Sequence, residues 1–172
     1  SIELLTNLKH MGFSTVITTP HVYTEFYPNT TQTIQDGAAQ LGKAIREADL
    51  QIEFRAAAEY FMDEHFETLL ENKALLTLDG KKVLVEMSFF SEPPKLHDYI
   101  FQMRTKGYEP ILAHPERYDY LDQGQYQRLR ELGCSFQINI LSLVGHYGTP
   151  IRKNALMLLK KNWGDFLGTD MH

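Results

Sequence analysis

Cysteine is almost absent from this sequence: Cys134 is the only one in 172 residues. A single thiol excludes a disulfide framework and a thiolate zinc site within one chain. Cys134 opens an apolar run, so we interpret it as a buried hydrophobic side chain. A cysteine nucleophile for phosphate chemistry needs a glycine-rich loop and a nearby arginine, and residues 135–138 contain neither. We therefore expect a reducing, cytoplasmic setting and chemistry that does not use a thiol.

Long hydrophobic runs and an excess of basic residues are also missing. No stretch approaches the roughly twenty apolar residues needed to cross a bilayer, and no signal-peptide core is present. The formal net charge of -5 argues against a surface that coats nucleic acid. We expect neither membrane insertion nor a nucleic-acid partner.

Helical and extended patterns alternate along the chain, which predicts an α/β fold with a parallel sheet. The chain has one domain's length, although an eight-unit α/β barrel typically needs about 250 residues. Asp63, Asp122 and Thr149 are the expected N-caps of three helices, the last with Pro150 at its first position. We expect six strands, at residues 15–18, 52–59, 82–86, 108–113, 135–140 and 165–168.

The pattern starts inside a helix and stops just past a strand. We therefore expect residues 1–172 to form a single domain that is truncated at both ends. The longest expected loop, residues 23–33, follows a candidate ligand, so we expect it to cover the functional site.

Side chains able to bind metal ions follow one strand after another. Parallel strands bring their carboxyl ends to one end of a barrel, where such residues meet. Imidazole nitrogens and carboxylate oxygens suit manganese, iron and zinc. The pattern therefore predicts a metallohydrolase site. Its candidate ligands are His21, Glu59, Glu86, His114, Asp170 and His172.

Each of these residues also has a simpler explanation. Taken alone, Glu59 or Glu86 is as well explained by a salt bridge to a nearby Lys or Arg, and His21 by a hydrogen bond within a turn. Four other histidines are expected at the surface or at helix caps: His10, His65, His97 and His146. Arg117, just past His114, carries a planar guanidinium suited to phosphate oxygens.

Five motifs together resemble the PHP (polymerase and histidinol phosphatase) superfamily. Within it, the chain is similar to the manganese-dependent bacterial protein-tyrosine phosphatases of capsule and exopolysaccharide systems. The motifs are Thr19-Pro20-His21, Ala58-Glu59-Tyr60, Val85-Glu86, the run Leu112-Ala113-His114-Pro115-Glu116-Arg117-Tyr118, and Gly168-Thr169-Asp170-Met171-His172.

The resemblance implies a distorted seven-stranded (βα) barrel whose first strand, with a His-x-His pair, is absent from this chain. An arginine that follows the Asp-x-His in the family is absent too. Three divalent metal ions are implied. Manganese is the expected metal, with iron or zinc as alternatives. Glu59 would bridge two ions. Glu86 and His114 would complete one ion's shell, with Asp170 on a neighbouring ion and His21 with His172 on the third.

The implied activity is metal-dependent hydrolysis of phosphomonoesters, with Arg117 and Glu59 as catalytic residues and Arg117 binding the phosphoryl group. The implied substrate is a phosphotyrosine protein, namely a bacterial tyrosine kinase of a capsule or exopolysaccharide system. Two alternatives remain open: another hydrolase of the superfamily, acting on histidinol phosphate or as a nuclease, and a non-catalytic binding module. Whether the chain forms a homo-oligomer is also left open.

Overall fold

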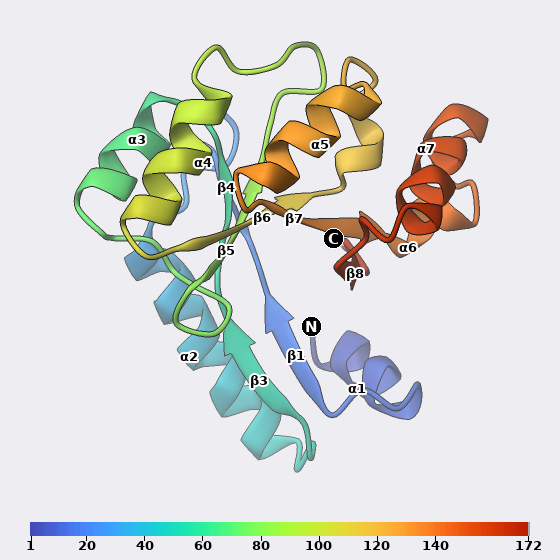
Figure 1. The fold of residues 1–172 in the computed structure, drawn as a ribbon. Coiled ribbons are helices and arrows are strands. Elements are labelled where there is room, and N and C mark those ends of the chain that lie inside the picture. The colour runs from blue at the N-terminus through green and yellow to red at the C-terminus, as the bar shows by residue number, and fades with distance from the viewer. Residues whose placement is uncertain (172) are drawn as a thin grey trace.

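The computed structural model describes residues 1–171. Its eight strands form six parallel extended segments, two of which are divided by a bend, and helices connect most of them (Figure 1). The strands are β1 (Thr15–Thr18), β2 (His21–Val22), β3 (Glu53–Ala56), β4 (Glu59–Phe61), β5 (Lys82–Glu86), β6 (Glu109–Ala113), β7 (Ser135–Asn139) and β8 (Phe166–Gly168). The helices are α1 (Ile2–His10), α2 (Thr31–Glu47), α3 (Glu64–Glu71), α4 (Leu96–Thr105), the 3-10 turn η1 (Pro115–Arg117), α5 (Gln123–Glu131), α6 (Ile140–Leu143) and α7 (Thr149–Lys160).

The strands lie side by side in chain order. β1 pairs with β3, and a six-stranded parallel sheet runs β2-β4-β5-β6-β7-β8. β1 continues into β2, and β3 into β4, across short bends that stay paired: Ala57 N–H donates to the Thr18 carbonyl at 2.8 Å. The predicted α/β class with a parallel sheet is confirmed, and the sequential order is that of a (βα) barrel-like fold.

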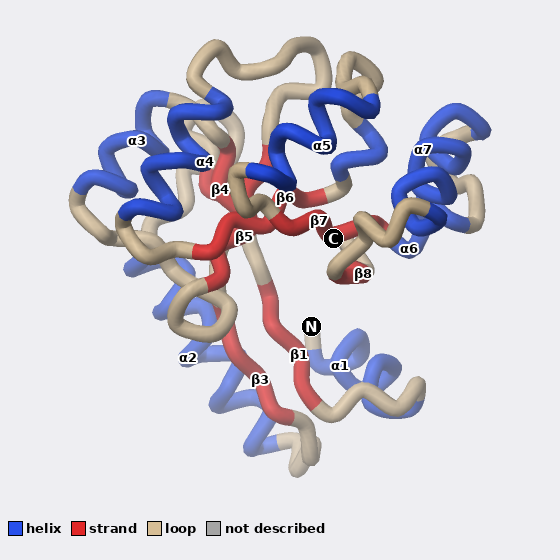
Figure 2. The backbone as a smooth tube through the Cα atoms, viewed as in Figure 1, coloured by secondary structure: helices blue, strands red, loops and turns tan. Residues whose placement is uncertain are grey.

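Two apolar cores support these strands. The larger lies between the six-stranded sheet and the helices α3, α4 and α5, which cover it on one side in Figure 2. Its central strands β5 and β6 are buried along nearly their whole length, as expected where both faces are covered. A smaller core joins α1 and α2 to β1 and β3 through Leu5, Leu8 and Ile45.

Helix starts follow the predicted caps in two of three cases. The side chain of Asp63 accepts the Phe66 N–H at 2.8 Å, and Asp122 accepts the Gln125 N–H at 2.8 Å. The prediction that Thr149 is an N-cap is wrong by one residue. Gly148, at φ 97°, is the N-cap because its carbonyl accepts the first helical bond, from Arg152.

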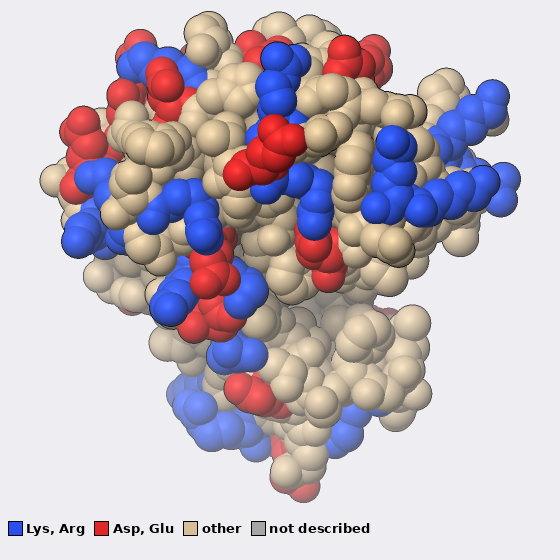
Figure 3. All heavy atoms as spheres, viewed as in Figure 1, with Lys and Arg blue, Asp and Glu red and all other residues tan. Residues whose placement is uncertain are grey.

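On the face shown in Figure 3, Lys and Arg are interspersed with Asp and Glu over most of the surface, and Lys and Arg gather over α7. A recess separates the body that carries β8 from the part that carries β1 and α1. Two cavities of about 250 and 270 Å³ lie there, between residues of β1 and residues 167–170. Within residues 1–171, no helix is long and apolar enough to span a membrane.

Candidate metal centre

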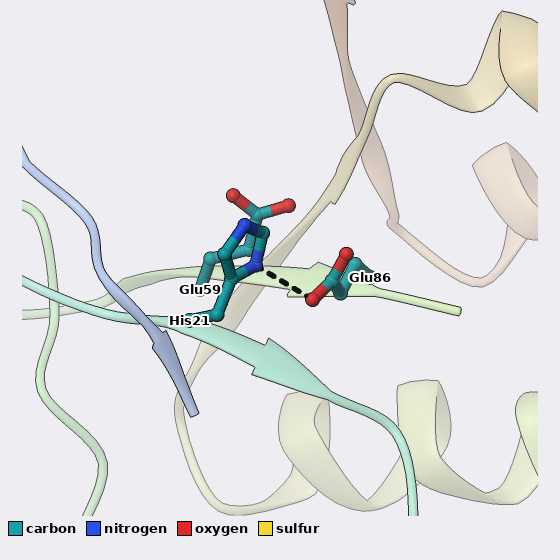
Figure 4. A group of neighbouring side chains, drawn as sticks. All are labelled: His21, Glu59 and Glu86. Carbon is teal, nitrogen blue, oxygen red and sulfur yellow. Dashed lines mark hydrogen bonds and ion pairs between the residues drawn. The ribbon is translucent and has the colours of Figure 1, made fainter. Parts of the chain in front are cut away.

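Three of the predicted ligands meet where neighbouring strands are paired. His21 is opposite Glu59 in the β2–β4 register, and Glu86 ends β5, the next strand. One ligand atom from each lies within 4.8 Å of the others. Figure 4 shows the imidazole of His21 between the two carboxylates. The parallel sheet thus brings together residues that are up to 65 positions apart in the sequence.

His114 follows β6 and joins this cluster. Its Nε2 lies 3.1 Å from Glu59 Oε1 and 3.8 Å from Glu86 Oε2, while His21 Nδ1 lies 2.7 Å from Glu86 Oε1. Within residues 1–171, the ion-pair partners of both glutamates are these histidines rather than a Lys or Arg. The salt-bridge explanation therefore fails for Glu59 and Glu86.

The cluster concentrates negative charge away from water. Glu59, Glu86 and His114 are only 4%, 7% and 4% exposed. The hydrogen bond to Glu86 raises the pKa of His21 above its usual value, helped by the charges of Glu86, Glu59 and Asp170 and opposed by burial. Buried carboxylates are costly unless a cation or hydrogen bonds compensate them. Nitrogen and oxygen donors of this kind fit a borderline divalent metal ion.

Two predicted ligands adopt backbone conformations that are uncommon for residues other than glycine. His114 has φ 36° and Asp170 has φ 48°. Such conformations cost about 1–3 kcal/mol and persist only where the surroundings impose them. The His114 N–H donates to the Gln137 carbonyl at 2.8 Å, which ties this turn to β7. Of the five non-glycine residues with positive φ in the described part of the chain, these two are predicted ligands.

Asp170 lies at the edge of the cluster and is bound by Arg117 and Asn139. Arg117 Nη1 donates to Asp170 Oδ2 at 3.3 Å, and Asn139 Nδ2 donates to the same oxygen at 2.6 Å. Sequence reasoning missed Asn139, although it ends β7 as Glu86 ends β5. The sixth predicted ligand, His172, lies outside the described residues.

Glu116 is buried between His114 and Arg117 but is directed elsewhere. It is fully buried, and its Oε1 accepts the Asn139 N–H at 3.0 Å. Burial raises the pKa of this carboxyl group above its usual value. Glu116 thus holds the end of β7, beside Asp170, in place.

A cavity of about 330 Å³ opens onto the cluster. Its polar wall contains His21, Glu86, His114, Arg117 and Asp170. Its other wall is largely aromatic and contains Tyr23, Phe26, Tyr27, Phe61, Phe89 and Phe90. Three of these rings come from residues 23–33, the predicted covering loop, and Tyr27 stacks on His21 with centroids 5.0 Å apart. His10, His65 and His146 are exposed, and neither they nor His97 line this cavity.

Known proteins of one family are similar to this chain along its whole length. The family model "Capsular polysaccharide synthesis, CpsB/CapC" matches residues 1–172. Tyrosine-protein phosphatase YwqE of Bacillus subtilis is 30% identical over 175 residues, covering 100% of this chain and 69% of that protein. Tyrosine-protein phosphatase CpsB of Streptococcus pneumoniae is 28% identical over 183 residues, covering 100% and 74%.

A solved structure supports the same relationship. It is described as belonging to YwqE of Bacillus subtilis and CpsB of Streptococcus pneumoniae, "unique metal-dependent tyrosine phosphatases". It matches this chain with a TM-score of 0.90 at 28% identity, covering 99% of this chain and 70% of that chain.

Proposed function

This chain belongs to the capsular polysaccharide synthesis family CpsB/CapC, and we propose that it is a metal-dependent protein-tyrosine phosphatase. The observation that carries this proposal is the buried cluster of His21, Glu59, Glu86 and His114 at the base of a cavity with an aromatic wall. The relatives named as tyrosine phosphatases cover the whole chain.

The metal-binding residues of this proposal are the six predicted from the sequence. Glu59 would hold metal as a carboxylate shared between two ions; it contacts His114 and is paired in register with His21. Glu86 and His114 would serve one ion, Asp170 a neighbouring one, and His21 with His172 a third. Three manganese ions are proposed, with iron or zinc as alternatives. Bound there, divalent metal ions supply a water of lowered pKa as the nucleophile and polarise the phosphoryl oxygens.

The protein's own groups bind and orient the phosphoester. Arg117 has its guanidinium in the cavity wall, where it can donate two parallel hydrogen bonds to phosphoryl oxygens and neutralise their charge. The aromatic wall, with Tyr23 stacked on Phe61 at 3.9 Å between centroids, can pack against a phenyl ring. This pairing favours phosphotyrosine over phosphoserine, which has no ring to bury.

We also propose that residues 1–172 are part of a seven-stranded barrel. The two cavities between β1 and residues 167–170 have the position that a further parallel strand would take. The physiological substrate is proposed to be a bacterial tyrosine kinase of a capsule or exopolysaccharide system, acted on in the cytoplasm.

Elemental analysis and a substrate panel test the function. The purified protein should bind divalent metal ions and hydrolyse phosphotyrosine peptides faster than phosphoserine peptides, histidinol phosphate or single-stranded oligonucleotides. Glu59→Gln should abolish this hydrolysis, whereas Glu47→Gln, on the exposed part of α2, should retain it.

Three results would overturn the proposal. Faster hydrolysis of histidinol phosphate would favour the rival enzyme of the superfamily, and cleavage of the oligonucleotide would favour a nuclease. Binding of phosphotyrosine peptides without metal ions or turnover would favour the non-catalytic module.

A further inference from the structure

The Arg117 guanidinium is in contact with two aromatic rings. Its Cζ lies 4.5 Å from the ring centroid of Phe89 and 4.4 Å from that of Tyr147. Both distances are within the range of a cation–π interaction. Phe89 lies in the loop after β5, and Tyr147 lies between α6 and α7, so two distant segments converge on one guanidinium. While it contacts these rings, the Arg117 guanidinium also donates a hydrogen bond from Nη1 to Asp170 Oδ2.

The Phe89 ring is held by the turn that supplies Arg117. The hydroxyl of Tyr118 accepts the Met87 N–H at 2.9 Å, and the hydroxyl of Tyr120 donates to the Ser88 carbonyl at 2.7 Å. The rings of Phe89 and Tyr118 stack with centroids 5.6 Å apart and planes 26° apart. The backbone that carries Phe89 is thus fixed relative to Arg117.

The Tyr147 ring is linked to the same site from the other segment. Asn139 Nδ2 lies 3.4 Å from the Tyr147 hydroxyl oxygen and 2.6 Å from Asp170 Oδ2. Asn139 is only 2% exposed. Tyr147 does not line the 330 Å³ cavity, whereas Phe89 does. A ligand in the cavity therefore meets Phe89 directly, and the contact of Tyr147 is with Arg117.

We propose that Phe89 and Tyr147 are positioning residues that fix the Arg117 guanidinium in the orientation in which it binds the phosphoryl group. The proposal rests on the proposed phosphatase function. A free arginine side chain samples many rotamers, and ring contacts that restrict it before binding lower the entropy lost on binding. A planar guanidinium can contact ring faces while its edge donates a pair of hydrogen bonds, and a lysine ammonium cannot reproduce this paired donation.

Tyr147 provides the test, because it lies outside the cavity. Tyr147→Leu removes the ring and should raise both KM for a phosphotyrosine peptide and the inhibition constant of inorganic phosphate by about three- to tenfold. The change in kcat should be smaller, and the metal content should not change. Tyr147→Phe keeps the ring and should restore both constants to within about twofold of the wild-type values. Phe101→Leu is the matched control, because it removes an exposed ring from α4, which does not line the cavity.

A double-mutant cycle decides whether Tyr147 acts through Arg117. In an Arg117→Ala background, Tyr147→Leu should change phosphate inhibition by less than about twofold, because the group it positions is gone. An equal loss in both backgrounds would refute the positioning role. Loss of binding in Tyr147→Phe would also refute it, since the hydroxyl rather than the ring would then be responsible.

A spectroscopic measurement separates this proposal from the proposed function. The Nε–Hε resonance of Arg117, assigned by its loss in Arg117→Lys, should carry a ring-current shift in the Zn²⁺-treated protein. Tyr147→Leu should reduce this shift, and Phe101→Leu should leave it unchanged. An enzyme without phosphotyrosine hydrolysis that keeps the shift would overturn the function and not the ring contacts. An active enzyme whose Arg117 resonance is insensitive to Tyr147→Leu would overturn the positioning role alone.

Discussion

Replacing Glu59 by Gln should remove most of the stabilisation that divalent metal ions give this protein. Glu59 is 4% exposed and lies 3.1 Å from His114, with Glu86 3.8 Å from the same imidazole nitrogen. Without a metal ion, the two carboxylates repel each other across a buried space. A bound cation removes this repulsion, so the folded state binds metal far better than the unfolded chain.

The size of the effect follows from mass action. A ligand present at one hundred times its dissociation constant stabilises the folded state by about 2.7 kcal/mol. For a domain of this length, each kcal/mol raises the melting temperature by about 2–4 °C, so Mn²⁺ should raise it by about 5–11 °C. Gln has nearly the shape of Glu and can still form a hydrogen bond to His114, so Glu59→Gln changes the charge without opening a cavity.

Thermal melts with Mn²⁺ and with EDTA measure this stabilisation. In Glu59→Gln the Mn²⁺-induced rise in melting temperature should fall to less than about half of the wild-type value. In His21→Ala the reduction should be smaller, because we propose that Glu59 is shared between two ions and that His21 binds one. Glu47→Gln on α2 is the control and should keep the full shift. An undiminished Mn²⁺ shift in Glu59→Gln would show that Glu59 is not a ligand, and the reasoning about the cluster would be refuted.

Three further substitutions probe separate parts of the structure. Arg117→Ala should lower kcat/KM for a phosphotyrosine peptide at least tenfold while elemental analysis finds the metal content unchanged, because the proposed role of the guanidinium is to bind phosphate and not metal; loss of the metal ions would contradict this role. Tyr118→Phe leaves the Met87 N–H without its acceptor in a buried site, and chemical denaturation should show a loss of about 1–3 kcal/mol; an unchanged midpoint would mean that water replaces the hydroxyl. Burial raises the pKa of the Cys134 thiol from 9.0 to about 12. The unfolded chain therefore loses this proton first, so the stability advantage of wild type over Cys134→Ala should be constant below about pH 9 and decrease between about pH 9 and 12; an advantage that grows with pH would have the wrong sign.

Local sequence signals predicted the elements well where a side chain acts on its own neighbours. Asp63 and Asp122 were identifiable as caps because each accepts an N–H three residues along the chain. The bends that divide β1 from β2 and β3 from β4 have no equally clear signal. Pro20 accounts for one of them, because it has no N–H to donate to the ladder. The Ala57-Ala58 bend lies beside it, and Ala57 and Glu59 donate hydrogen bonds to the carbonyls of Thr18 and Pro20.

The candidate site was predictable only in part, because some of its contacts come from segments that are distant in the sequence. Glu86 ends β5 and His114 follows β6, as predicted from the sequence. His21 and Glu59 were also predicted to end strands, but they begin β2 and β4, each directly after a short bend. Parallel pairing nevertheless brings the four side chains together. The contacts of Tyr147 depend on where the segment between α6 and α7 lies, and no periodicity reports that. Asn139 had a signal, its place at the end of β7, which was not used.

The turn after β6 explains why one short run of sequence was so informative. Four of its residues point to four different parts of the site: His114 to Glu59, Glu116 to the backbone of β7, Arg117 toward Asp170 and Tyr118 to the loop after β5. The left-handed conformation of His114 followed by a 3-10 turn distributes these side chains in this way. The proposed metal ligand, the proposed phosphate-binding group and two structural anchors thus share one short turn. A substitution that alters this conformation should therefore affect metal binding, phosphate binding and stability together, whereas a change to a single side chain should affect mainly one of them.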